Sequence, residues 1–373
     1  MQLDFHTSKV QELYSYLETS IFDIVCRHLK KQIGKADGVD IQEWQVQALA
    51  DTGQLTNEVL KKIAEVSGIA PGAIREAVYA SRCEAQDTVD DYLSHRKTPP
   101  DYGMNFKLDA YVRQAVINLD NLVSQSLISN NVAAQIYTDI INNVTAEVIT
   151  GISTIDDAVS KIVNQWLDKG VPSGFIDKGG RTWSIENYAR TTVTTAANNA
   201  YNQITEERTK EYGLTTFLVG SHPAARPACS RIQGKVADYR PMSEIPPGWP
   251  YRSVYDPFWQ ADYKQPHGHR GINCSHPQFP YDPEFDENNM TQYDPEEARK
   301  ADEIEAGRKA KANNIRKAKK KLAAFEALGN EAKTKYYKNL LAKQRADMVQ
   351  YTQSHGLKRD YSMERIEKRL ASV

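Results

Sequence analysis

The sequence predicts a mainly α-helical protein that carries a small α+β module containing cysteine and histidine. Three observations support this fold class. Apolar residues recur at three- and four-residue spacing before residue 214 and after residue 282. The segment between them is rich in proline and glycine, which favour turns over long helices. A lysine-rich stretch with helical spacing follows. We therefore expect a helical N-terminal region, a central module and a helical, basic C-terminal tail.

Changes in composition divide the chain into four predicted regions. A chain of 373 residues can contain two or three domains, each with its own core. The regions are an N-terminal helical region (1–100), a long-helix region (101–213), a strand and loop module with the Cys/His cluster (214–282), and an acidic linker with a basic helical tail (283–373). The pair Pro99-Pro100 marks the first boundary.

Bulk composition excludes several classes of protein. A hydrophobic content of 40% and a charged content of 25% are ordinary for a soluble protein. No apolar run approaches the roughly 18 residues that span a bilayer, and the first residues lack the features of a secretory signal. The four cysteines are too few and too scattered for a disulfide framework, so we expect a reducing environment and no membrane.

The N-terminal region is expected to contain short helices joined by polar turns. Its first helix has one apolar face, formed by Val10, Leu13, Leu17, Ile21 and Ile24. A turn is expected at 34–38, and a second amphipathic helix over 55–66. Gly68 should end that helix and Pro71 should begin another, because proline is tolerated in a first turn.

The long-helix region is expected to be helical almost throughout, from Met104 to Tyr212. Apolar faces are formed by Leu108, Val112, Ala115, Leu119 and Leu122, and by Ile136, Ile140, Val144 and Val148. Thr154 resembles the N-cap of a helix that Gly170 ends. Ser184 should cap a long helix that ends near Tyr212 and Gly213.

The module should begin with a buried strand over 214–220, where β-branched and aromatic residues lie between glycines. After Gly234 the frequent prolines predict short strands and ordered loops. The tail should form an antiparallel helical hairpin with a turn at Gly329-Asn330. Its charge is asymmetric, since residues 308–343 carry twelve basic and two acidic residues although the whole chain has a net charge of −1.

Sulfur and imidazole groups gather in the module. The candidate ligands are His222, Cys229, His269, Cys274 and His276. Zinc prefers tetrahedral sites of thiolate and imidazole, so a structural zinc ion is one interpretation. The other is an unmetallated cluster of packed and surface residues. A catalytic metal would need an open position and a nearby base, and a Cys/His nucleophile is a further alternative. The sequence has no His-Glu-x-x-His motif, paired acidic motif or Gly-rich phosphate loop.

The order of short motifs in this region resembles a known family. Ser-His222-x-x-x-Arg-Pro-x-Cys229, Gln-Gly-Lys235 and Gly-Ile-Asn-Cys274-x-His276 follow an upstream Ala-Arg190-Thr-Thr. Together they resemble the minor capsid (minor head) proteins of tailed bacteriophages, in particular the minor capsid protein 2 family within the wider Mu-F-like head-morphogenesis group. The likeness covers roughly residues 10 to 285.

The resemblance implies a low-copy structural component of the virion that is assembled in the cytoplasm of the host bacterium. It implies portal or major capsid proteins as partners, and a role in head assembly and in DNA packaging or delivery. The lysines Lys317, Lys319, Lys320 and Lys321 are candidate contacts to packaged double-stranded DNA or to an acidic partner. A metal-dependent nucleic-acid enzyme and a non-catalytic DNA-binding adaptor are the alternatives. We expect no catalysis, and a structural zinc ion is the one cofactor that these residues allow.

Overall fold

A computed structural model of the chain describes residues 4–36, 38–97, 132–177 and 179–366, together with residues 110, 113–114 and 116–118. The described chain is mainly helical with a few short strands, which confirms the predicted fold class. It forms two compact units. Unit 1 comprises Met1–Ser8, Gly72–Ile117 and Arg190–Gly307, and unit 2 comprises Lys9–Pro71, Asn118–Ala189 and Arg308–Val373. The predicted boundary at Pro99-Pro100 and all five residues of the predicted apolar face over 108–122 lie outside the described residues.

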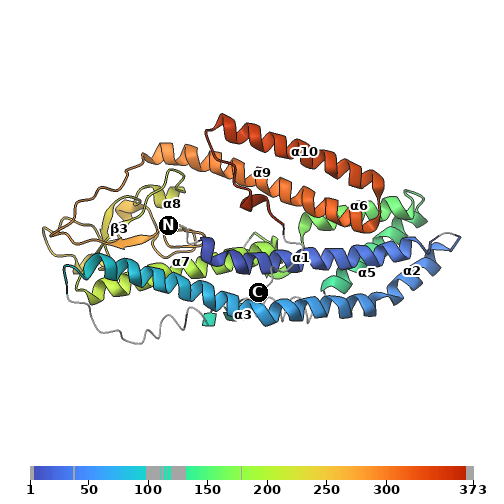
Figure 1. Cartoon of the computed structure of the whole chain (residues 1–373), viewed down its shortest axis with the longest axis horizontal. Coiled ribbons are helices and arrows are strands. Elements are labelled where there is room, and N and C mark those ends of the chain that lie inside the picture. The colour runs from blue at the N-terminus through green and yellow to red at the C-terminus, as the bar shows by residue number, and fades with distance from the viewer. Residues whose placement is uncertain are drawn as a thin grey trace. The chain divides into compact units, whose positions relative to one another are not determined.

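Figure 1 labels the helices and strand β3. The helices are α1 (Asp4–Ile33), α2 (Ile41–Ala50), α3 (Thr52–Leu93), α5 (Val132–Ile149), α6 (Ile155–Lys169), α7 (Ile185–Glu211), α8 (Pro227–Ser230), α9 (Pro295–Leu328) and α10 (Glu331–Ser354). The strands are β1 (Pro172–Ile176), β2 (Thr182–Ser184), β3 (Thr216–Val219), β4 (Val236–Asp238) and β5 (Gln278–Pro280). Among the described residues, no helix is long and apolar enough to cross a membrane.

Helix α3 corrects one prediction. Gly68 does not end a helix and Pro71 does not begin one, because α3 continues through both residues. Proline inside a helix removes one hydrogen bond and costs about 3 kcal/mol. The buried stripe of Val66, Ala70 and Ile74 runs past this point without interruption. Packing of that stripe therefore outweighs the local preference for a helix break.

A second correction concerns residues 172–184, which were expected to lie in a helical region. They form an antiparallel hairpin in which Pro172 pairs with Ser184 and Ile176 pairs with Thr182. Asp177 organises the turn, since its carboxylate accepts hydrogen bonds from the Gly179 amide at 3.0 Å and the Trp183 indole at 3.1 Å. These strands are too short to show a recognisable alternation of apolar and polar residues in the sequence.

The predicted caps of α6 are confirmed, and the predicted turn before α10 also provides a cap. The Thr154 hydroxyl accepts a hydrogen bond from the Asp157 amide at the start of α6, and Gly170 ends that helix with a φ of 75°. Asn330 caps α10 after the predicted turn, accepting from the Lys333 amide at 2.9 Å. The antiparallel hairpin of α9 and α10 is visible in Figure 1. Its apolar contacts involve Ala312, Ile315, Ala318, Leu341 and Met348.

The module in unit 1 contains a three-stranded antiparallel sheet in the order β4-β3-β5. Strand β3 is the central, buried strand that the sequence predicted. Phe217 in β3 is fully buried and stacks on Tyr239 with ring centroids 3.9 Å apart. The surrounding core is completed by Val219, Ile232, Ala237, Val254, Trp259, Ala261 and Tyr263. This small core positions the loops that carry the cysteines and histidines.

Replacing Phe217 with alanine should destabilise unit 1 by about 3–5 kcal/mol, because the substitution removes buried surface and leaves a cavity. Hydrogen exchange of the β3 amides would measure this loss of stability. The matched control is Phe258→Ala, since Phe258 is 59% exposed and should cost less than about 1 kcal/mol. Equal effects of the two substitutions would contradict the assigned core.

Candidate metal centre

Four of the five predicted ligand residues meet at one point in unit 1. One ligand atom from each of Cys229, His269, Cys274 and His276 lies within 4.8 Å of every other, and all four residues are buried. The Sγ atoms of Cys229 and Cys274 are 3.8 Å apart. The Sγ atom of Cys274 lies 3.8 Å from Nδ1 of His269 and 3.7 Å from Nδ1 of His276. We call these four residues the Cys/His cluster.

His222, the fifth candidate, lies beside the cluster and is not one of its four members. Its ring stacks on that of His276 with centroids 4.3 Å apart. Its Nε2 atom is 3.5 Å from the hydroxyl of Ser275. His222 is therefore placed to cover the His276 ring.

Short local structures present the cluster residues. Cys229 lies in the single turn of α8, where its amide donates to the Arg226 carbonyl at 2.8 Å. The other three residues, His269, Cys274 and His276, lie on the loop that precedes β5. This loop is tightly wound: a side chain at Gly268 would overlap the Asp262 carbonyl oxygen, and one at Gly271 would overlap the Gln265 carbonyl oxygen. Only glycine fits such close backbone approaches.

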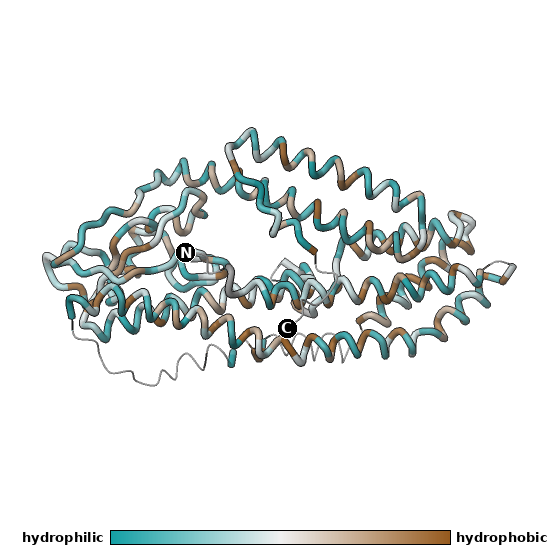
Figure 2. Tube along the Cα trace, in the orientation of Figure 1, coloured by the Kyte–Doolittle hydropathy of each residue, from teal (hydrophilic) through white to brown (hydrophobic). Residues whose placement is uncertain are grey.

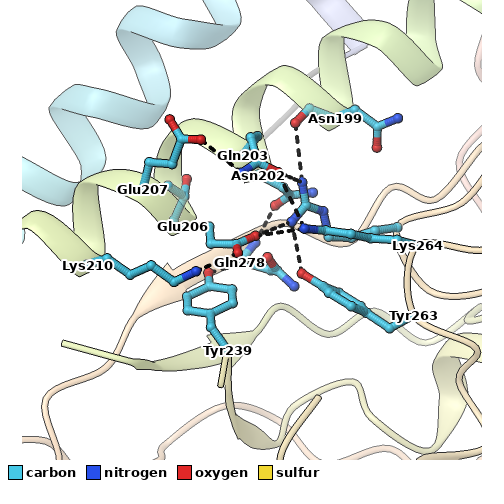
Figure 3. Close-up of polar contacts among 12 residues, drawn as sticks. Asn199, Asn202, Gln203, Glu206, Glu207, Lys210, Tyr239, Tyr263, Lys264 and Gln278 are labelled. Carbon is cyan, nitrogen blue, oxygen red and sulfur yellow. Dashed lines mark hydrogen bonds and ion pairs between the residues drawn. The ribbon is translucent and has the colours of Figure 1, made fainter. Parts of the chain in front are cut away.

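A row of polar residues on α7 holds this loop. The Asn198 side chain donates to the Cys274 carbonyl at 2.9 Å, and the Asn202 side chain donates to the His276 carbonyl at 3.2 Å. Four residues further along the helix, Glu206 pairs with Arg270 at 2.9 Å. Figure 3 shows the surroundings of Glu206, where Lys210 and Lys264 pair with the same carboxylate. The Tyr263 hydroxyl accepts a hydrogen bond from Arg270.

Sequence reasoning missed this polar row, although a signal was present. Asn198, Asn202, Glu206 and Lys210 recur every four residues, so they form one continuous face of a helix. A polar face on a helix that is otherwise well buried indicates hydrogen-bond partners elsewhere in the fold. The identity of the partners could not be deduced, because they come from a loop more than sixty residues away.

The two thiols of the cluster differ in acidity. A hydrogen bond from Cys229, together with the neighbouring His269, holds the pKa of Cys274 well below its usual range despite burial. The same hydrogen bond and burial raise the pKa of the Cys229 thiol. Burial lowers the pKa of His269. Cysteine sulfur and imidazole nitrogen are the donors that soft and borderline metal ions accept.

The four predicted DNA-contact lysines lie on α9 in unit 2, in different environments. Lys320 is paired with Glu18 at 2.7 Å and with Glu186 at 2.6 Å, and both carboxylates are buried. Lys321 is paired with Asp168 at 2.7 Å, and Lys319 donates to the Glu364 carbonyl at 2.6 Å. Lys317 is exposed. Three of the four ammonium groups therefore face groups of their own unit.

Comparison with known proteins first identifies the class, which is that of phage structural proteins. The chain is 32% identical over 331 residues to the "Structural protein" of Lactococcus phage LL-H, covering 86% of this chain and 88% of that relative. The family model described as "Phage minor capsid protein 2" matches residues 1–353. The chain therefore belongs to the phage minor capsid protein 2 family, as its motifs predicted. No solved structure matches it.

Replacing Lys320 with methionine should destabilise unit 2 by about 3–5 kcal/mol, because the substitution removes a cation from two buried carboxylates. The control, Lys317→Met, removes the same charge from an exposed position and should change the stability by less than about 0.5 kcal/mol. Denaturant unfolding would measure both. A Lys320 variant as stable as the control would show that this ion pairing is unimportant.

Glu206 should stabilise unit 1 at neutral pH, and this contribution should be lost in acid. Burial raises the pKa of Glu206, but the hydrogen bond from Lys210 and the charges of Lys264 and Arg270 outweigh burial, so the net pKa is lowered. A carboxyl with a lowered folded-state pKa stabilises the fold above its unfolded pKa of about 4.3, and this stabilisation is lost as the pH falls through the folded value.

Glu206→Gln should therefore reduce the stability of unit 1 at neutral pH by about 3–5 kcal/mol, because Arg270 stays buried without its counter-charge. The difference from the unmodified chain should shrink as the pH falls below about 4. Hydrogen exchange of unit 1 between neutral and acid pH would follow this difference. Glu207→Gln, one residue along the helix, is the matched control, and an identical pH profile for both variants would refute the assignment.

Proposed function

We propose that this protein is a non-enzymatic component of the phage head that acts in head assembly near the portal. The supporting observation is the match to the phage minor capsid protein 2 family over residues 1–353. The relative from phage LL-H is also described as a structural protein. We further propose the portal and major capsid proteins as its partners, and the cytoplasm of the host bacterium as its place of assembly.

The candidate site favours a structural role over a catalytic one. A catalytic metal site keeps one position open for water or substrate, with a general base nearby. The Cys/His cluster instead has four protein donors, all buried, and the ring of His222 covers one of them. A metal-dependent nucleic-acid enzyme is therefore the weaker alternative.

We also propose that the exposed face of α10 contacts packaged DNA. Figure 2 shows this helix as predominantly hydrophilic. Its exposed basic residues are Lys333, Lys335, Lys338, Lys343 and Arg345. Attraction to phosphates needs only accessible positive charge and is independent of base sequence. Lys338 lies 3.6 Å from Glu326, but both side chains are exposed. These residues are therefore better placed for that role than Lys320, whose charge is matched by two buried carboxylates.

The structural role predicts that the protein is present at low copy in purified phage particles or proheads. Quantitative mass spectrometry of purified particles would measure its copy number, and cross-linking would report whether portal peptides are joined to it. Recovery of the protein from lysate alone, with none in particles, would contradict the proposal.

The DNA contact predicts a salt-sensitive affinity for double-stranded DNA. Changing Lys333, Lys335 and Lys338 to glutamine should lower the salt slope of binding by roughly one for each DNA phosphate that is no longer neutralised. Substitution is a cleaner test than truncation, because removing α9 would also remove Lys320 from its buried partners.

The charge-matched control changes Lys30, Lys31 and Lys35 near the end of α1, all of which are basic residues at exposed positions of unit 2. This control should retain the full salt slope. An equal decrease of the slope in the two triple variants would show that net charge alone matters. Absence of DNA binding by the unmodified protein would end this part of the proposal.

A further inference from the structure

We propose that the Cys/His cluster is a closed, four-ligand structural Zn²⁺ site that fastens the α8 turn to the loop preceding β5. The ligands are Cys229, His269, Cys274 and His276. This inference concerns the construction of unit 1 and goes beyond the proposed role of the protein in the phage head.

The distances suit a tetrahedral zinc ion. Two sulfurs at about 2.3 Å from a tetrahedral zinc lie about 3.8 Å apart, and a sulfur lies about 3.6 Å from an imidazole nitrogen at 2.0–2.1 Å. The sulfurs here are 3.8 Å apart, and the two nitrogens lie 3.8 and 3.7 Å from Cys274 Sγ. The remaining pairs lie within 4.8 Å, so binding would draw the four ligands slightly inward.

The donor set selects among metals. Two thiolates and two imidazoles in tetrahedral arrangement are the donors of structural zinc sites, whereas calcium and magnesium require oxygen ligands. The four residues are at most 3% exposed, which leaves no room for the coordinated waters that magnesium retains.

The side-chain amide of Gln233 fixes the His276 imidazole in the orientation that a metal needs. The Oε1 atom of Gln233 can only accept, and it lies 3.3 Å from Nε2 of His276. His276 therefore donates its proton from Nε2 and keeps a lone pair on Nδ1, which is the atom that faces Cys274 Sγ. Metal-binding histidines commonly have such a partner on the second nitrogen.

The loop that carries three ligands needs an external constraint. Its backbone adopts positive φ at Asp262, Lys264, Arg270 and Asn273. Non-glycine residues in this region each cost energy, and such conformations persist only when their surroundings enforce them. Among the described residues the apolar cluster at this point is small, with Ala225, Cys229, Cys274 and Ala298 buried and Tyr293 packed against them. A metal ion would supply the binding energy that this small core lacks.

The alternative use of the same sulfurs is a disulfide. Bond formation would bring the Sγ atoms of Cys229 and Cys274 from 3.8 Å to bonding distance and would require an oxidant to accept two electrons. It would leave the two imidazoles without a metal. The metal content and the intact mass of the full chain distinguish the two states.

The full chain should be purified without chelator or affinity metal and its metal content measured by elemental analysis and native mass spectrometry. We expect one zinc per chain, and reconstitution with Co²⁺ should give the intense visible bands of a tetrahedral thiolate site. A metal-free chain that does not take up Zn²⁺ or Co²⁺ would overturn the proposal. A mass lower by two hydrogen atoms, with Cys229 joined to Cys274, would also overturn it.

Variants then test the ligand set. Cys274→Ser and His276→Ala should lose stoichiometric zinc. His222→Ala and Cys83→Ser, which alter a covering ring and an exposed thiol outside the cluster, should retain it. His269→Cys keeps four donors, so it should retain zinc and shift the Co²⁺ bands towards those of a three-sulfur site. Loss of zinc in His222→Ala alone, with zinc retained in His276→Ala, would contradict the assigned ligands. If a ligand variant does not fold, the metal content and the Co²⁺ spectrum of the unmodified chain still test the proposal.

Discussion

The polar face of α7 is the interaction on which the module of unit 1 depends. Asn198 and Asn202 hold the carbonyls of two cluster residues, and Glu206 holds Arg270, the residue after His269. These groups are buried, so each would be costly without its partner. Because all partners come from one loop, the helix specifies a single conformation for it. This loop also brings His269, Cys274 and His276 close to Cys229 in α8.

Features that depend on neighbouring residues could be predicted from the sequence. The cap at Thr154, the turn at Gly329-Asn330 and the buried strand β3 follow from local side-chain chemistry. Features that depend on tertiary packing could not. Helix α3 continues through Pro71 because its buried stripe continues, and the hairpin of β1 and β2 is too short to give a clear period.

In the candidate site, too, features that depend on neighbouring residues were predictable and features that depend on tertiary packing were not. Chain proximity predicts that Cys274 and His276 lie together, and the Cys/His content of the module singled out five residues, of which the structure brings four together. It could not separate His222, which lies beside the cluster and stacks on the His276 ring. A run of lysines likewise has no sequence feature that distinguishes the exposed Lys317 from Lys320, because the buried partners Glu18 and Glu186 lie far away in the chain.

Membership of a phage minor capsid family is consistent with an assembly component whose loops must hold their shape, and we propose that zinc bound by the Cys/His cluster fastens them. The most direct test is hydrogen exchange of the full chain before and after treatment with a zinc chelator. We predict that protection is lost at 222–233 and 261–278, while α9 and α10 from residue 308 onward are unchanged. Unchanged protection in the two loop segments, in a chain shown to have contained zinc, would contradict a zinc-fastened module.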